Sequence, residues 1–487
     1  MNEILFPLSI TLVVILPLLC AAAIAIRSTD AVAFRLAPWM ALPALVLAVF
    51  VPEDTLLRLP GLLLGTQLGL ADETGRLFLL FTALLWWLAG MYAQSYLSDP
   101  SGRKRFFLYY LLSMTGNFGL ILAQDVASFY LFFTLMSFAS YGLVIHERSI
   151  AALRAGRIYI VLVLIGEVML FAAMVMATAS AGSNGFDDIR KALVQAESRD
   201  LIIFLALIGF GIKAGVLGLH VWLPLAHPVA PTPASAVLSG AMIKAGLLGW
   251  LRLLPLGEVA FLSWGDAFIA LGLATAFYGV LIGLTQRDPK TLLAYSSISQ
   301  IGYVVVGIAL GTPLGILGGL FHLINHATFK SLLFLSSGAI EYGTETRKLS
   351  RMGGLSRNMP VSTASAAVGF LSISGIPPFN GFWSKLFIVV ALIQAQHYIL
   401  ASVAVLVSFL TILYFMRVQR SLFFGDVPAG LAKTKEVPYL MRFSLVVLAL
   451  MCLAMGLFYP YLSGTVLAPA RDALLEGTAY VQKVFGI

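Results

Sequence analysis

Long apolar segments follow one another along almost the whole chain, and they constrain its fold more than any other feature. A transmembrane helix needs about 20 consecutive apolar residues. Of the 487 residues, 60% are hydrophobic and 11% are charged, which is more apolar surface than a soluble globule can bury. The sequence therefore predicts an all-α polytopic membrane protein with about fourteen transmembrane helices. We place them at about 4–26, 36–52, 77–97, 106–124, 126–145, 156–180, 201–222, 233–254, 260–285, 292–311, 313–340, 360–394, 398–424 and 439–465.

Two of these segments meet helix breakers at membrane depth. Pro224 and further prolines follow the seventh segment, and residues 375–381, which include Pro377 and Pro378, interrupt the twelfth. Proline removes a helix hydrogen bond, and a carbonyl freed inside a membrane must be satisfied by protein or water. We therefore predict broken helices beside a polar interior, with these prolines as candidate hinge or hydration positions.

The basic residues indicate the orientation of the chain. If the N-terminus lies outside, arginine and lysine gather in the loops that then face the cytoplasm, as the positive-inside rule requires. We therefore predict a multi-pass protein of a bacterial-type inner (plasma) membrane, with both termini on the outer side. Orientation in the lipid bilayer accounts for the formal net charge of +8, and we predict no nucleic-acid partner.

Away from the ends of the apolar segments, five charged residues sit well inside them: Glu167, Lys213, Lys244, Lys330 and Lys385. A lysine at the bilayer centre costs roughly 2.5–3.5 kcal/mol on insertion scales. Two interpretations are open. The side chains pair or extend toward the surface for structural reasons, or they form a buried relay that exchanges protons. Four such lysines in one chain favour the relay.

Histidines add to this pattern. His322, His326 and Lys330 are four residues apart, which puts them on one face of a helix. Histidine suits proton transfer because one ring nitrogen can accept while the other donates. A zinc site is an alternative at this spacing, but no nearby carboxylate or cysteine completes a ligand set, so we predict no metal. His220 and His227 flank the expected break, where neighbouring hydroxyls either hold water or cap helices.

Four motifs occur in order along the chain. They span residues 211–246, 293–303, 321–330 and 375–385, and they include HVWLPLAHPVAPTP, LAYSSISQIGY, FHLINHATFK and GIPPFNGFWSK. Together they resemble the antiporter-like subunits shared by respiratory complex I, membrane-bound hydrogenases and Mrp-type sodium/proton antiporters. The resemblance covers roughly residues 70–425. It implies two inverted repeats of five helices, with helices 7 and 12 broken, a general transporter design.

The resemblance also implies a division of the chain and roles for its buried residues. Helices 1–3 would occupy residues 1–105, the two inverted repeats (helices 4–8 and 9–13) 106–254 and 255–424, and helix 14 with an amphipathic tail 425–487. The proton relay would run from the seventh helix through the eighth and a central polar axis to the twelfth. The matching residues are Lys213, Lys244, His322, His326, Lys330 and Lys385.

One position departs from the family pattern. Members usually carry a glutamate in the fifth helix that pairs with the seventh-helix lysine, and the aligned residue here is Thr134. Glu167 is the only carboxylate near the middle of a predicted membrane segment. Either Glu167 replaces the missing partner of Lys213, or it bonds elsewhere and the first half-channel is altered.

Three functions fit this sequence. The first is translocation of protons, or of protons and sodium, by an antiporter-like subunit that works with other membrane subunits of a hydrogenase, Mrp or complex I type assembly. The second is the membrane subunit of a proton-driven bicarbonate uptake system with a peripheral catalytic subunit. The third is a scaffold that no longer pumps, which Thr134 favours and the retained lysines and histidines oppose. We see no redox or catalytic motif and predict no cofactor, so any chemistry would come from other chains.

Overall fold

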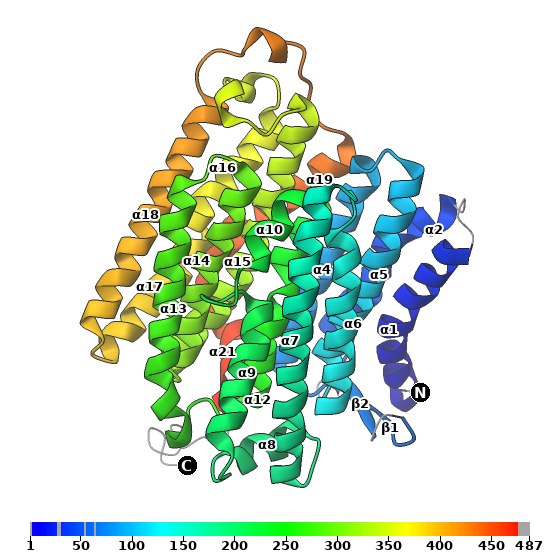
Figure 1. Cartoon of the computed structure of the whole chain (residues 1–487), viewed down its shortest axis with the longest axis vertical. Helices are drawn as coiled ribbons and strands as arrows, with labels where there is room; N and C mark the ends of the chain where they lie inside the picture. Colours follow the sequence, from blue (N-terminus) through cyan, green and yellow to red (C-terminus); the bar gives the residue numbers. More distant parts are fainter. Residues whose placement is uncertain (1, 27–30, 53–54, 63–64, 476–487) are drawn as a thin grey trace.

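The computed structural model describes residues 2–26, 31–52, 55–62 and 65–475. It consists almost entirely of helices that run side by side between two ends of the molecule (Figure 1). Within the described ranges, ten helices are long and apolar enough to cross a membrane. The predicted all-α, multi-pass membrane fold is therefore confirmed. The count of fourteen crossings, the inverted repeats and the division of the chain at residues 105, 254 and 424 stay predictions.

The N-terminal part of the bundle starts with the helices that Figure 1 draws in blue and cyan. Side-chain caps start several of them: Asp72 accepts from Gly75 N (2.5 Å) and Ser149 from Ala152 N (3.1 Å), which satisfies amides that have no partner in the first turn. The elements are α1 (Asn2–Ile26), α2 (Ala31–Leu36), η1 (Ala37–Ala41), α3 (Leu42–Phe50), α4 (Glu73–Tyr96), α5 (Pro100–Leu122), α6 (Val126–Val144) and α7 (Ile150–Ala181).

A β-hairpin that the sequence does not predict occupies the region between α3 and α4. Strands β1 (Thr55–Leu59) and β2 (Thr66–Leu70) pair antiparallel, with Thr55 opposite Leu70. The hairpin is fixed to the start of α6, because the Asp125 carboxylate accepts from Gln67 N (2.8 Å).

The centre of the chain contains the first broken helix. Its elements are α8 (Phe186–Leu193), α9 (Arg199–Ala214), α10 (Trp222–Val229), α11 (Thr232–Val237), η2 (Leu238–Met242), α12 (Lys244–Leu253) and α13 (Val259–Thr285). The break between α9 and α10 lies earlier than the prolines that predict it. Gly215 and Gly218 open it with φ of +79° and +86°, a conformation that favours glycine. Pro224 lies instead in the first turn of α10, where a missing amide breaks no helix bond.

The C-terminal part contains the second broken helix. Its elements are α14 (Pro289–Ala309), α15 (Pro313–Thr344), η3 (Leu349–Arg351), η4 (Leu355–Arg357), α16 (Pro360–Ser374), α17 (Asn380–Gln394), α18 (Tyr398–Phe423), η5 (Ala429–Leu431), α19 (Tyr439–Leu457), α20 (Tyr459–Leu462), η6 (Ser463–Leu467) and α21 (Ala468–Leu475). The break between α16 and α17 contains Pro377 and Pro378, where the sequence predicts it.

The predicted amphipathic tail is only partly at the surface. Ala470, Leu474 and Leu475 of α21 are buried, and Thr74 Oγ1 donates to Ala470 O (2.9 Å), which joins the tail to the start of α4. The rest of that tail, residues 476–487, lies outside the described residues.

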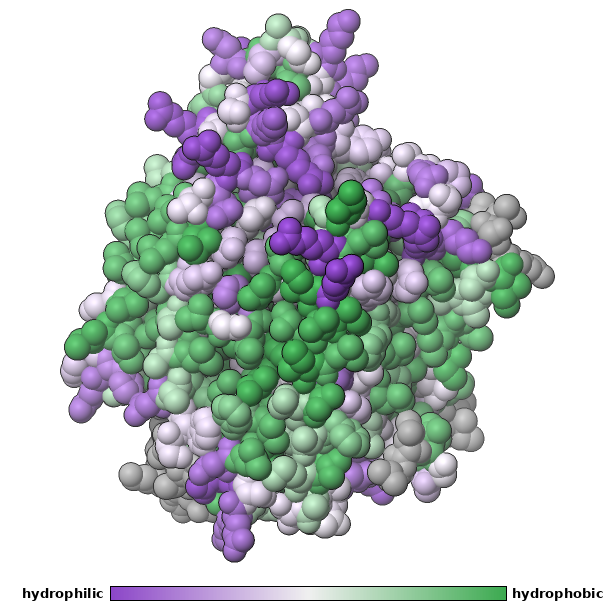
Figure 2. Space-filling view, viewed as in Figure 1, coloured by the Kyte–Doolittle hydropathy of each residue, from purple (hydrophilic) through white to green (hydrophobic). Residues whose placement is uncertain are grey.

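The inside and the outside of the bundle have opposite character. α15 is buried along most of its length and packs against α14, α16 and α17. Hydrophobic side chains form a broad band across the middle of the surface, and hydrophilic side chains gather at one end (Figure 2). We name this end, which carries Arg347, Lys348, Arg351 and Arg357, the basic end. The hairpin and α8 lie at the opposite end (Figure 1).

Candidate functional site

Lys213 lies in the last turn of α9, directly before the first break. Its side chain is 3% exposed and is surrounded by α6, α7, α9 and α10. The ammonium Nζ donates to Ser137 Oγ (3.2 Å) and Tyr159 OH (3.3 Å). Neutral hydroxyls therefore hold this lysine, and the sequence motif gave no sign of them because they come from other helices.

Glu167 faces the same pocket from α7. The pocket encloses about 250 Å³ and is lined by both Glu167 and Lys213. Thr134 Oγ1 donates to Glu167 Oε2 (2.6 Å), while Glu167 Oε1 has no hydrogen-bond partner among the described residues. Among the described residues, no ion pair within 4.0 Å joins Glu167 to Lys213. Thr134, Glu167 and Lys213 are therefore close together, but Glu167 and Lys213 form no direct salt bridge.

Lys244 follows a π-helical turn. Ile243 N bonds Leu238 O (3.1 Å), five residues back, and this leaves the Ser239 carbonyl to accept from Lys244 Nζ. Ser239 Oγ lies 2.9 Å from Ser297 Oγ on α14, so the turn also contacts the second half of the chain. Lys213 has its contacts with α6 and α7, and no hydrogen bond or ion pair among the described residues connects it with Lys244.

Lys330 occupies the middle of α15 and is fully buried. Its Nζ donates to Leu293 O (2.6 Å) and to Ser296 Oγ, both on α14. One and two turns earlier on α15, His326 and His322 are also fully buried. The residues of the predicted central axis therefore all lie inside the bundle.

His322 connects this axis to the second break. Its Nδ1 lies 2.9 Å from Ser384 Oγ on α17, and Asn325 Nδ2 donates to the same oxygen (3.0 Å). Neither ring nitrogen of His326 has a hydrogen-bond partner within the described part of the chain. Buried polar atoms without a protein partner are usually satisfied by ordered water.

Lys385 closes the second break. Its Nζ donates across the break to Ile373 O (2.7 Å), a carbonyl near the end of α16, and to Ser408 Oγ (3.3 Å) on α18. It also lies 5.3 Å from the centre of the Tyr303 ring. The broken helix therefore has a free carbonyl at membrane depth, as expected, and the lysine satisfies it.

The two predicted hinge histidines lie in different settings. His220 is in the first break, with its ring 4.9 Å from Tyr278, while His227 is inside α10 and stacks on Phe334 at 4.5 Å. His227 is fully buried, and among the described residues neither of its ring nitrogens has a partner. No three His, Cys, Asp or Glu side chains group as metal ligands in the described ranges.

Sequence reasoning missed two buried cations, Arg252 on α12 and Lys290 on α14. Lys290, in the first turn of α14, is 1% exposed and lies 3.7 Å from a carboxylate oxygen of Glu341, which also pairs with Arg347 (2.6 Å). In the sequence, Lys290 precedes an apolar segment, and Glu341 and Arg347 follow one. The sequence therefore assigns these residues to loops. No pattern in the sequence shows that the start of α14 and the end of α15 meet.

Comparison with known proteins identifies similar chains. Residues 123–411 match the family described as NADH:quinone oxidoreductase/Mrp antiporter, TM. Hydrogenase-4 component B of Escherichia coli (strain K12) is 32% identical over 420 residues, covering 80% of this chain and 62% of that protein. Na(+)/H(+) antiporter subunit A1 of Staphylococcus saprophyticus is 33% identical over 418 residues, covering 80% of this chain and 52% of that protein. The chain thus spans only about half to three-fifths of these relatives.

Solved structures share the fold. A chain of the membrane-bound sulfane sulfur reductase, an archaeal respiratory membrane complex, superposes with a TM-score of 0.81 at 30% identity, covering 92% of this chain and 76% of that chain. A chain of respiratory complex I from Thermus thermophilus gives a TM-score of 0.85 at 25% identity, covering 96% of this chain and 98% of that chain. Both are chains of multi-subunit membrane complexes.

Proposed function

The chain belongs to the NADH:quinone oxidoreductase/Mrp antiporter transmembrane family, and from this premise we propose that it translocates protons across a membrane as one subunit of a larger membrane complex. Its relatives carry the names of a hydrogenase component and a sodium/proton antiporter subunit, so sodium is the second ion to test. The proposal further places the basic end in the cytoplasm, in agreement with the positive-inside rule.

The observation that carries the proposal is a series of buried bases in the second half of the chain. We name Lys244, Lys330, His326, His322 and Lys385 the relay row. His326 is one helical turn from both Lys330 and His322 on α15, and His322 Nδ1 lies 2.9 Å from Ser384 Oγ, in the residue next to Lys385. Ser239, whose carbonyl accepts from Lys244 Nζ, contacts Ser297 (2.9 Å), beside the Ser296 that accepts from Lys330 Nζ. Each member is therefore close enough to at least one other member to influence whether that neighbour carries a proton.

Proton movement along the relay row needs no redox chemistry. A lysine ammonium donates its proton to a neutral imidazole nitrogen, and the imidazolium then donates to the next neutral amine. Where two members do not touch, ordered water would connect them, and the unpartnered ring nitrogens of His326 are suitable contacts for it. Charge in a neighbouring subunit would drive the steps, because an unpaired charge in a dry interior is costly.

The proposal is tested by removing the central lysine. We expect Lys330→Met to abolish proton flux in everted membrane vesicles that contain the assembled complex, measured with a pH-sensitive dye after an imposed pH gradient. Methionine keeps the length of the side chain but carries no proton. Lys433→Met, which changes an exposed lysine at the basic end, is the control and should transport as the unchanged protein does.

Assembly is checked in the same membranes by co-purification of the other subunits, so that a lost complex is not mistaken for a lost relay. If Lys330→Met assembles and transports normally, the chain is a scaffold and the proposal fails. Repeating the flux measurement with and without sodium shows whether sodium exchanges for protons.

A further inference from the structure

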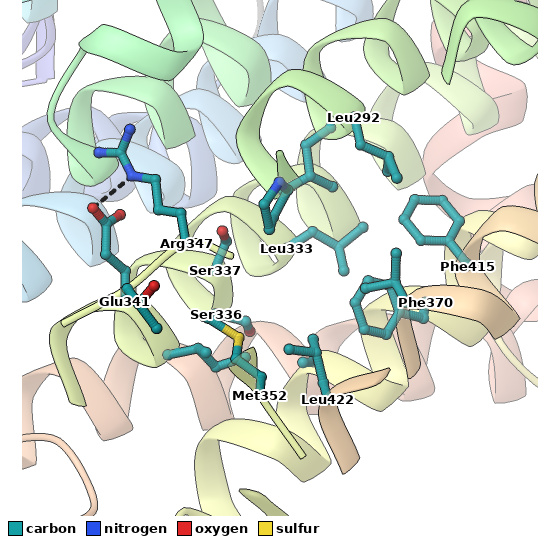
Figure 3. Close-up of a pocket in the computed structure, with 16 residues that line it drawn as sticks. Leu292, Leu333, Ser336, Ser337, Glu341, Arg347, Met352, Phe370, Phe415 and Leu422 are labelled. Atoms are coloured by element: carbon teal, nitrogen blue, oxygen red, sulfur yellow. Dashed lines mark hydrogen bonds and ion pairs between the residues drawn. The ribbon is translucent and has the colours of Figure 1, made fainter. Parts of the chain in front are cut away.

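A cluster of three charged side chains forms at the basic end, where the start of α14 meets the end of α15. Lys290 Nζ is 3.7 Å from Glu341 Oε2, and Arg347 Nε donates to Glu341 Oε1 (2.6 Å), the contact drawn in Figure 3. Only Lys290 is fully inside, since it is 1% exposed while the Glu341 side chain is 24% exposed. The carboxylate thus joins a solvent-contacting position to a buried amine.

The cluster is attached to α10, the second half of the first broken helix. Lys290 Nζ donates to Ala230 O (3.2 Å), and Arg347 Nη1 donates to Pro228 O (2.7 Å). Both carbonyls lie at the carboxyl end of α10, where cations are favoured by the helix dipole. The same turn carries His227, so the cluster and this histidine are held together.

His227 connects the cluster with the relay row. It stacks on the Phe334 ring (4.5 Å), and Lys330 Nζ lies 5.8 Å from the centre of the same ring. It is fully buried, and within the described part of the chain no group bonds to either of its ring nitrogens.

A pocket lies beside the cluster. It encloses about 490 Å³ between α14, α15, α16 and α18, and Glu341 and Arg347 form part of its wall (Figure 3). Leu293 also lines it, and the carbonyl of Leu293 is the one that accepts from Lys330 Nζ. The pocket therefore lies next to Leu293, the residue whose carbonyl accepts from Lys330.

We propose that Glu341 and Lys290 deliver protons from the basic end to His227, and so give the relay row an entrance separate from the Glu167–Lys213 pocket. This rests on the proposed function. A proton on the Glu341 carboxyl passes to the neutral Lys290 amine, directly after a small movement or through one water. The ammonium then protonates a free ring nitrogen of His227, and the imidazolium gives the proton to a neutral Lys330 amine. No electron moves and no other bond breaks.

The alternative is a purely mechanical role, in which the three charges only fasten α10 to α14 and α15. The variant Glu341→Gln distinguishes proton delivery from this mechanical role. Glutamine keeps an oxygen for Arg347 but cannot take up and release a proton, so we expect flux in vesicles to fall about tenfold or more while assembly and thermal stability hold. Glu436→Gln is the matched control, because Glu436 is a carboxylate at the same end whose oxygens accept from Val361 N (2.8 Å) and Ser362 N (3.2 Å).

A second readout depends on chemistry and not on packing. In Glu341→Ala the pocket gains space beside Lys290, and added formate, a small weak acid, should restore a large part of the flux. Vesicles that contain Lys330→Met show how much formate itself carries across the membrane. Rescue beyond that background supports the entrance, and its absence contradicts it.

The results separate this inference from the proposed function. If Lys330→Met stops transport and Glu341→Gln does not, the entrance is wrong and the relay stands. If neither variant changes transport, the proposed function fails with it. If Arg347→Gln and Glu341→Gln lose flux only together with thermal stability, the cluster is a mechanical fastener and the inference is overturned.

Discussion

The lysines of the relay row are held by backbone carbonyls and hydroxyls. Lys385 bonds Ile373 O, Lys330 bonds Leu293 O, and Lys244 bonds Ser239 O. An amine donates a hydrogen bond with or without its extra proton, whereas a carboxylate partner would favour the charged form. In the proposed relay, the positions of these side chains would therefore persist while each lysine gains or loses its proton.

Substitution of Glu167 tests whether its carboxylate takes part in proton transfer. If Glu167 acts as the partner of Lys213, Glu167→Gln should lower proton flux about tenfold or more, because the pocket loses its carboxylate. The double variant Glu167→Gln/Thr134→Glu moves the carboxylate to the adjacent α6, since Thr134 and Glu167 are in contact (2.6 Å), and should recover part of the flux. Unchanged flux in Glu167→Gln would show that the carboxylate has no part in the relay.

The sequence predicts the buried residues better than their partners. A lysine in an apolar segment is visible without a structure, as Lys213 and Lys385 show. The hydroxyls of Ser137 and Tyr159 that hold Lys213 are not, because they come from α6 and α7 and resemble ordinary packing residues. Lys290 was missed for a related reason: its burial depends on how the ends of helices meet.

At the scale of elements, each broken helix depends on a close approach of backbone to backbone. At the second break, a Cβ on Gly381 would lie 1.9 Å from Ser372 O, so only glycine lets α17 begin beside the end of α16. The prolines predict that a break exists, and at the second break they also predict its place. At the first break, the left-handed conformations of Gly215 and Gly218 set the place, six or more residues before Pro224, the first of the prolines.

Gly381→Ala tests this contact. The added methyl group forces the two half-helices apart, which should destabilise the fold by about 1–3 kcal/mol and lower the midpoint temperature of unfolding by several degrees. Flux should fall as well, since Lys385 bridges the same break. Gly430→Ala is the control, because a Cβ there meets nothing within 4 Å. Equal stability of the two variants would contradict the tight approach.

At the scale of the whole molecule, the two ends differ in charge and in structure. The basic end carries the arginine- and lysine-rich loops, and the opposite end carries the hairpin and α8 (Figures 1 and 2). Cationic loops are retained in the cytoplasm during insertion. The helical content and the long apolar helices follow from sequence alone, while the hairpin does not, since TLLRL and TQLGL are too short to show a strand pattern among apolar residues.

Cysteine labelling tests the orientation. Lys433 at the basic end and Lys191 on α8 at the opposite end are both exposed. With a membrane-impermeant maleimide, we expect Lys191→Cys to react in intact cells and Lys433→Cys to react only after the membrane is opened. The reverse pattern would invert the orientation. The unchanged protein measures any background from Cys20 and Cys452.

The composition of the relay row has a consequence for how it fills. Among the described residues, its five members are all bases, with no carboxylate between them. Two like charges about 10 Å apart repel by about 1.7 kcal/mol at an effective dielectric constant of about 20, which is more than tenfold in affinity. In the proposed relay, proton binding along the row is therefore negatively cooperative, and its occupancy should change gradually over a wide range of proton concentration.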